Sequence, residues 1–289
     1  MITNVAWCSH LYAGSGSGKT RLCLEGLCHR WGLYISCRGA SSVRAAGSHD
    51  FTVATELMTT MSTWGSCTQN RDAAHRAFAM LICARVFVLK CLLVKLPPDT
   101  DMETARRRWV LVQAMPPIDI ATDIFAAVLK SLRAAVKTDL LDFTESMLKN
   151  MGILEPNVLP FVVVDEAQVA AEYLNESFRA TAGIDSRPVL QPFYSFLWDT
   201  RLFQGVILAG TGLSMKMVRT AVYSRSAQRQ NHSQVPVVFV EVGEFTKDGT
   251  DHKTYIEKYL PFSINAFDQR LMERILYWFR GRYAHPGTL

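Results

Sequence analysis

The sequence lacks the cysteine pattern of a disulfide framework or of a zinc site. It contains seven cysteines, which is an odd number, and none of them forms a C-x-x-C pair. Both kinds of site depend on regularly paired cysteines. We therefore expect small buried thiols in a reducing compartment.

The sequence also lacks the features of a secretory signal and of a membrane-spanning segment. Residues 1–14 have no charged start and no uninterrupted apolar run. The most apolar stretch, residues 77–96, is interrupted by Arg85, Lys90 and Lys95. Such a segment is unfavourable in lipid and typical of a helix buried inside a domain. We expect an intracellular protein, in the cytoplasm or the nucleus, with no membrane partner.

Neither sign of charge is in strong excess. The 289 residues include 31 Lys or Arg and 26 Asp or Glu, for a net charge of +5. This bias permits contact with nucleic acid or phosphorylated ligands, but it is not that of a basic tail. The densest basic cluster, Arg106, Arg107 and Arg108, is expected on a solvated helix face. With 49% hydrophobic residues and no low-complexity tract, the composition predicts a folded protein.

Apolar runs that suit strands alternate with segments that have helical spacing. The run from Phe161 to Val164 is continuous and β-branched, which is typical of a strand buried on both faces of a parallel sheet. We expect strands at about 5–13, 33–37, 161–164, 205–209 and 235–242. We expect helices from about 19 and at about 72–96, 102–114, 119–136, 138–150, 188–200 and 267–282. This alternation predicts an α/β fold with a parallel sheet.

The heptad GSGSGKT at residues 14–20 matches the phosphate-binding loop pattern, with alanine at its first position. Glycines let successive backbone N–H groups converge on an anion, and the helix that follows adds the positive end of its dipole. We predict that Lys19 reaches the β and γ phosphates and that the Thr20 hydroxyl ligates Mg²⁺. The predicted nucleotide-binding residues are Ala13, Gly14, Ser15, Gly16, Ser17, Gly18, Lys19 and Thr20.

Two acids follow the buried strand at residues 161–164, and a threonine follows the next one. Asp165 is placed to hold the Mg²⁺ through water, together with Thr20. Glu166 is placed to orient the attacking water of a hydrolysis. Thr211, in ILAGTG, is predicted to contact the γ-phosphate or that water; the alternative is a turn residue between glycines. The predicted catalytic residues are therefore Glu166, Lys19 and Thr211.

These motifs together resemble the ASCE branch of P-loop ATPases, which includes AAA+ and STAND proteins. The segments GSGKTRLCLEGLCHRWGLYI, VVVDEAQ, ILAGTGLSM and YLPFSINAFDQRLMERILYWFRGR are similar to the NTPase domain of fungal Crinkler-type proteins, related to retrotransposon hot spot proteins. The similarity covers about residues 10–283. It implies an ATP-binding and ATP-hydrolysing module that uses Mg²⁺, the regulatory or motor part of a larger effector-type protein.

For the fold, the resemblance implies a P-loop NTPase three-layer sandwich with a parallel sheet and a large helical insertion. We expect one domain over residues 1–289, with the insertion at about 51–150 and a C-terminal helical segment at about 250–283. A finger arginine would complete such a site. The pattern does not choose among the candidates Arg219, Arg225, Arg229, Arg280 and Arg282.

Other nucleotide-dependent functions fit the motifs less well. A GTPase needs an N-K-x-D motif and an ABC ATPase an L-S-G-G-Q signature, and neither is present. The DEAQ at 165–168 also suits a superfamily 1 helicase, which needs a second RecA-like domain. A metabolite kinase stays open, although Glu166 favours water as the acceptor.

A slow STAND-type switch would use the same residues with less turnover. Self-association and nucleic-acid binding also stay open.

Overall fold

The computed structural model describes most of the chain between residues 8 and 210. The described residues are 8–12, 18–38, 46–61, 65–119, 122–153, 159–179, 186–210, 237–239 and 270. Residues 13–17 of the predicted loop, Thr211 and the five candidate finger arginines lie outside them, and so does the predicted segment at about 250–283 except for Arg270.

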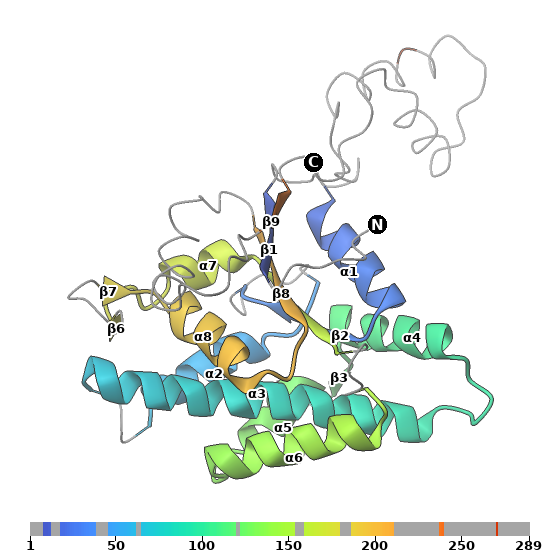
Figure 1. Ribbon diagram of the computed structural model, residues 1–289, viewed down its shortest axis with the longest axis horizontal. Helices are drawn as coiled ribbons and strands as arrows, with labels where there is room; N and C mark the ends of the chain where they lie inside the picture. The colour runs from blue at the N-terminus through green and yellow to red at the C-terminus, as the bar shows by residue number, and fades with distance from the viewer. Residues whose placement is uncertain are drawn as a thin grey trace.

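Five parallel strands form the central sheet (Figure 1). They are β1 (Cys8–Tyr12), β2 (Gly32–Ser36), β5 (Phe161–Asp165), β8 (Gly205–Gly210) and β9 (Val237–Phe239). Their order across the sheet is β2-β5-β8-β1-β9. The five strands expected from the sequence are therefore confirmed. Because all of them run in parallel, their carboxyl ends lie at one edge of the sheet, where ligands bind in open α/β folds.

Helices occupy most of the remaining described chain. They are α1 (Lys19–His29), α2 (Asp50–Thr59), α3 (Cys67–Lys95), α4 (Met102–Ala114), α5 (Ile124–Ser131), α6 (Lys137–Asn150), α7 (Ala167–Glu172) and α8 (Leu190–Thr200). Two short antiparallel pairs join β3 (Ile118–Asp119) to β4 (Thr122–Asp123) and β6 (Phe178–Arg179) to β7 (Ser186–Arg187). The helices from α2 to α6 all lie between β2 and β5 in the chain, as expected of a helical insertion.

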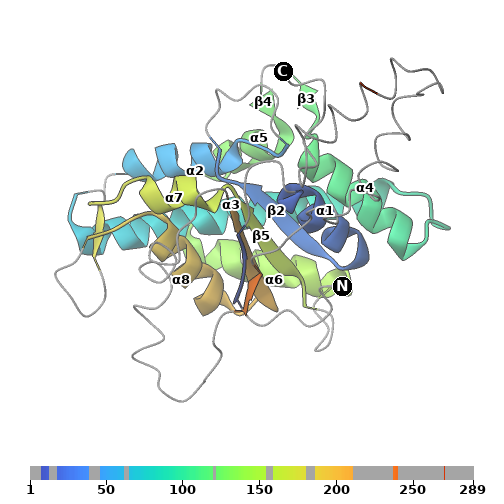
Figure 2. The ribbon, with the colours of Figure 1, turned by 90° about the horizontal axis from the view of Figure 1, so that it is seen from above.

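The sheet is covered by helices on both faces, and alternate residues of each strand face the two layers (Figures 1 and 2). On one face, Phe161 and Val163 pack with Leu27 of α1 and Val110 of α4. On the other face the buried cluster includes Val162, Val164, Val206 and Leu208 together with residues of α2, α3, α5, α6 and α8. This arrangement confirms the predicted α/β three-layer sandwich and makes the inserted helices part of its core.

The helices differ from the sequence pattern in several places: α7 was not expected, and α5 ends at Ser131 where the expected helix ran to about 136. The pattern does not single out α2 as a separate helix. Helix α3 begins at Cys67, five positions before the expected start, because Ser66 and Gln69 form a capping box. Helix α5 begins at Ile124, and not at 119, because Asp123 caps it by accepting the N–H groups of Phe125 and Ala126, each at 3.0 Å.

Helix α3 carries the most apolar part of the chain. Within the described residues, Gln69–Lys95 is the helix long and apolar enough to cross a membrane, but 67% of its most apolar window is buried inside the fold. It forms the long central helix beneath the sheet in Figure 1, packed against α2, α5, α6 and α8. Its position is that of a core helix, as the sequence predicts for residues 77–96.

The cysteines whose side chains the structure describes are free thiols. Cys23, Cys37 and Cys83 are buried, Cys28 and Cys67 are partly buried, and Cys91 is exposed. Burial raises the pKa of Cys37 well above its ordinary value and does the same for Cys23. A buried thiol with a raised pKa is unreactive, so these two cysteines serve packing.

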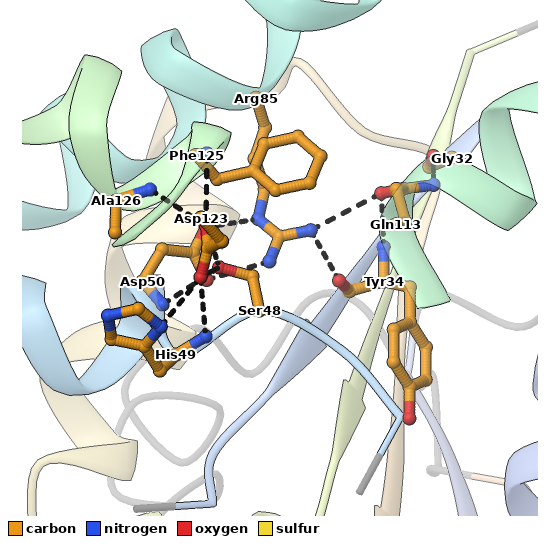
Figure 3. A network of polar contacts seen from close by, with 10 residues as sticks. All are labelled: Gly32, Tyr34, Ser48, His49, Asp50, Arg85, Gln113, Asp123, Phe125 and Ala126. Carbon is orange, nitrogen blue, oxygen red and sulfur yellow. Dashed lines mark hydrogen bonds and ion pairs between the residues drawn. The ribbon is translucent and has the colours of Figure 1, made fainter. Parts of the chain in front are cut away.

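Side chains of the insertion satisfy the free backbone groups of the outer strand β2 (Figure 3). The Tyr34 N–H donates to Gln113 Oε1 at 2.8 Å, and Arg85 Nη1 donates to the Tyr34 carbonyl at 2.5 Å. Trp109 Nε1 and Gln113 Nε2 both donate to the Gly32 carbonyl. An exposed edge strand invites pairing with another chain, and this cover prevents it. It also attaches β2 firmly to α3 and α4.

Candidate functional site

Thr20 and Asp165 meet at the carboxyl edge of the sheet. Thr20 lies in the first turn of α1, and Asp165 is the last residue of β5. The Thr20 Oγ1 donates a hydrogen bond to Asp165 Oδ2 at 2.7 Å, across 145 positions of sequence. Strand β8 lies between β1 and β5, and α1 contacts both β8 and β2. Helix α1 therefore crosses the sheet and brings the end of the loop to Asp165.

Gly18 forms the junction between the predicted loop and α1. Its φ of 83° lies in the left-handed region, which glycine adopts without a Cβ penalty. In the described residues no side chain caps this end of α1. An uncapped helix start directs its first N–H groups and the positive end of its dipole outward, as an anion-binding site requires.

Lys19 lies at this same helix start with its side chain largely buried. Burial lowers the pKa of Lys19 below its ordinary value, while the nearby Asp165 and Glu166 carboxylates act in the opposite direction. The lysine is thus a desolvated cation close to two acids. Such a cation gains most when a polyanion replaces the lost water, because its interaction with phosphate is strong in a site of low dielectric.

The Asp165 carboxylate is buried and held at both oxygens. Its Oδ2 accepts the hydroxyls of Thr20 and of Tyr34, the latter at 2.6 Å, and its Oδ1 accepts the Glu166 backbone N–H at 2.9 Å. Burial, and then the Asp165 charge, raise the pKa of Tyr34. Its phenol therefore stays protonated as a donor over the ordinary pH range.

The donor atoms at this point suit magnesium. A hydroxyl and a carboxylate are hard oxygen ligands, and Mg²⁺ is usually held by one or two such groups together with waters and substrate phosphates. Among the residues described, no three His, Cys, Asp or Glu side chains are grouped to form a metal cage of their own. Thr20 and Asp165 are therefore the residues that would hold the metal.

Glu166 is held in an unusual backbone conformation beside Asp165. Its φ of 54° and ψ of 37° lie in the left-handed region, where a residue with a Cβ costs about 1–3 kcal/mol, and it precedes the first turn of α7. Its Oε1 forms an ion pair with Arg38 Nη2 at 2.5 Å, and its Oε2 accepts a hydrogen bond from Gln168 Nε2. Two partners from different elements thus orient a strained carboxylate at the site.

The end of β8 approaches the same place. A Cβ on Gly210 would lie 2.2 Å from Gln168 Oε1 and 3.4 Å from the Ala167 nitrogen. A larger residue at position 210 would displace the Gln168 amide, so β8 and the start of α7 approach closely here. The carboxyl end of β8 therefore lies beside the start of α7, which Glu166 directly precedes.

The structure brings together Gly18, Lys19, Thr20, Asp165 and Glu166 of the predicted site. Residues Ala13, Gly14, Ser15, Gly16, Ser17 and Thr211 lie outside the described residues. The catalytic and binding roles of all these residues stay predictions. The parallel sheet, the junction of loop and helix at Gly18, and the contact of Thr20 with Asp165 are features of an α/β P-loop NTPase fold.

Sequence reasoning missed Tyr34, Arg38 and Gln168. Arg38 follows the end of β2, and the common edge of parallel strands could have pointed to it. Gln168 belongs to the DEAQ segment but lay outside the predicted residues. Tyr34 had no signal, because an aromatic residue within a strand is ordinary.

Comparison with known proteins gives a distant structural alignment. No family model matches the chain, and no curated protein matches it. A solved structure, the Walker-type ATPase PABY2304 of Pyrococcus abyssi, aligns with a TM-score of 0.46 and 14% identity. The alignment covers 97% of this chain and 60% of that one, so the chain spans about three fifths of its length.

Proposed function

We propose that the chain binds ATP as its Mg²⁺ complex and hydrolyses it. Ala13 to Thr20 would surround the phosphates, Lys19 would pair with the β and γ phosphates, and Thr20 and Asp165 would hold the metal. The metal would neutralise charge on the phosphate oxygens. Glu166 would accept the proton of the attacking water, and Thr211 would contact the γ-phosphate or that water.

One observation carries this proposal. The 2.7 Å hydrogen bond between Thr20 and Asp165 unites two distant sequence motifs beside Lys19 and Glu166. A glycine-serine linker followed by a lysine would have no reason to end at the carboxyl edge of the sheet. Strand-end acids that served only solubility would be exposed, whereas Asp165 is 3% exposed.

The test is an equilibrium binding and turnover assay with ATP and with GTP, each with and without DNA or RNA. We expect ATP to bind in the presence of Mg²⁺ and to be hydrolysed over many turnovers. Lys19→Ala should abolish binding, with Lys149→Ala, an exposed lysine of α6, as the control. Undiminished binding by Lys19→Ala would refute the loop assignment. Stimulation by nucleic acid would favour the helicase-like alternative.

A second candidate function is a slow nucleotide-dependent switch of the STAND type. It is favoured by the two partners of Glu166, since Arg38 engages one carboxylate oxygen and Gln168 the other. An attacking water would have to displace one of them. Binding without appreciable turnover would support the switch, in which the nucleotide stabilises one conformation.

The wider setting follows the resemblance stated from the sequence. We propose that this module is the regulatory or motor part of a larger intracellular effector-type protein related to the Crinkler type. Partners beyond ATP would be another copy of the chain or a nucleic acid. The molecular mass of the protein in solution, measured with and without ATP, tests self-association.

A further inference from the structure

Tyr34 has a place in the site that neither sequence motif assigns. It lies on β2, its side chain is 1% exposed, and its hydroxyl donates to Asp165 Oδ2 at 2.6 Å. The Thr20 hydroxyl donates to this same oxygen at 2.7 Å. Hydroxyls from two different elements thus converge on one carboxylate oxygen, at the point where the proposed function places the metal.

We propose that Tyr34 is a positioning residue for the Mg²⁺ of the bound nucleotide, acting through the Asp165 carboxylate. This role rests on the proposed function. With Oδ2 held by Tyr34 and Oδ1 held by the Glu166 N–H, the carboxylate cannot rotate freely. The proton of Thr20 is therefore directed to Oδ2, and the lone pairs of its hydroxyl are left for the metal. Residues that hydrogen-bond to a metal ligand without contacting the metal commonly tune metal affinity.

The position of Tyr34 is itself determined by the helical insertion. Gln113 accepts the Tyr34 N–H, and Arg85 donates to the Tyr34 carbonyl. Figure 3 shows the ring extending away from these groups, with its hydroxyl at the far end. Helices α3 and α4 thereby influence the metal site through β2, without contacting Asp165 in the described bonds.

A packing role for Tyr34 makes a different prediction. Its ring is part of the core between α1 and the sheet, together with Cys23, Leu27 and Phe161. If packing were its whole role, loss of the hydroxyl would lower stability and would leave the Mg²⁺ requirement unchanged. The positioning role predicts a selective change in that requirement, because phenylalanine preserves the ring.

The experiment titrates Mg²⁺ into the full chain with a fluorescent ATP analogue and measures binding, not turnover. We expect Tyr34→Phe to require about 10-fold more Mg²⁺ for half-maximal binding, as is common when an outer-shell partner is lost. Its affinity for the analogue in EDTA should stay within about twofold of wild type, because the phosphate-binding residues are intact. Tyr194→Phe, at a buried tyrosine of α8, controls for loss of an interior phenol.

The possible outcomes of this titration test the role of Tyr34 separately from the proposed function. An unchanged Mg²⁺ requirement in Tyr34→Phe, or an equal loss with and without Mg²⁺, overturns the role of Tyr34 and leaves the proposed function standing. A wild-type chain that shows no Mg²⁺-dependent binding overturns the proposed function, and this role with it. Para-aminophenylalanine at position 34 keeps a hydrogen-bond donor. The Mg²⁺ concentration that it needs for half-maximal binding should therefore return towards the wild-type value. If Tyr34→Phe fails to fold, para-fluorophenylalanine replaces it as the variant without a donor.

Discussion

Arg85 and Asp50 form an ion pair with both side chains fully buried. Arg85 Nε and Nη2 donate to the two Asp50 oxygens, each at 2.7 Å, and both side chains are 0% exposed. The guanidinium also lies 4.7 Å from the centre of the Phe125 ring and donates to the Tyr34 carbonyl. One buried cation therefore joins α2, α3, α5 and the outer strand of the sheet (Figure 3).

Replacing one partner of this pair should be strongly destabilising. Arg85→Met leaves the Asp50 carboxylate buried without its cation, which typically costs about 3–5 kcal/mol. The double variant Asp50→Leu with Arg85→Met should lose less free energy of unfolding than Arg85→Met alone, because it leaves no unpaired charge in the core. Urea unfolding followed by circular dichroism measures the free energy of unfolding of each variant. The control Arg107→Met breaks an exposed pair with Glu103 and should cost less than about 1 kcal/mol. A loss that small for Arg85→Met would contradict the prediction.

The lowered pKa of Lys19 should make ATP affinity depend on pH. The ammonium group must be charged to pair with phosphate, so affinity should fall as pH rises through that pKa, at a pH below the ordinary 10.5. In the protein without nucleotide, the effect of this lysine on folding stability has the opposite dependence on pH. The unfolded chain there binds more protons than the folded one, so this group's contribution to stability increases with pH towards 10.5.

The dissociation constant of ATP, measured from neutral pH upward, checks this dependence. Lys19→Arg is the matched control, because a guanidinium has a pKa above about 12 and stays charged. Whatever its absolute affinity, its pH profile should be flatter than that of wild type. Equal profiles for the two proteins would assign the pH dependence to another group.

Glu166→Gln should separate binding from hydrolysis. The amide can still accept a hydrogen bond but cannot take the proton of a water, and a positioned general base contributes about 10²–10⁴-fold in rate. We expect ATP to bind with little change and turnover to fall by that factor. Single-turnover measurement of phosphate release is the readout. Normal turnover would remove Glu166 from the mechanism.

Arg38→Ala should increase turnover. The 2.5 Å ion pair engages one oxygen of Glu166, and Arg38 is 43% exposed, so breaking the pair should barely affect folding. Arg38 is the exposed partner and Glu166 is 15% exposed, so we expect the pair to contribute about 1 kcal/mol, which corresponds to about fivefold in rate. Steady-state phosphate release compares Arg38→Ala with the exposed-pair control Arg107→Ala. A fall in turnover would mean that Arg38 orients Glu166 productively.

Part of the site could be predicted because its signals are local. The GSGSGKT heptad specifies a turn that needs glycine, and Gly18 has the left-handed conformation that this requires. The apolar run before Asp165 specifies a strand buried on both faces, and all residues of β5 are buried. The start of α5 was misplaced, because the capping bonds of Asp123 outweigh the apolar pattern before it.

The partners of the predicted acids could not be found in the same way. Arg38 and Glu166 are 128 positions apart, and Tyr34 and Asp165 are 131 apart. Their contacts exist because β2 pairs with β5 in a register that sets Ser36 beside Asp165. No periodicity in a single segment specifies which strand becomes its neighbour.

The amino-acid sequence by itself therefore determined most of the elements and the chemistry at their ends: a phosphate-loop pattern before α1 and two acids at the end of β5. The tertiary structure decided which side chains hold those acids, Tyr34 on Asp165 and Arg38 on Glu166. The physical reason is that hydrophobic spacing and turn chemistry act over a few residues. Strand order and helix packing instead bring together side chains more than a hundred positions apart.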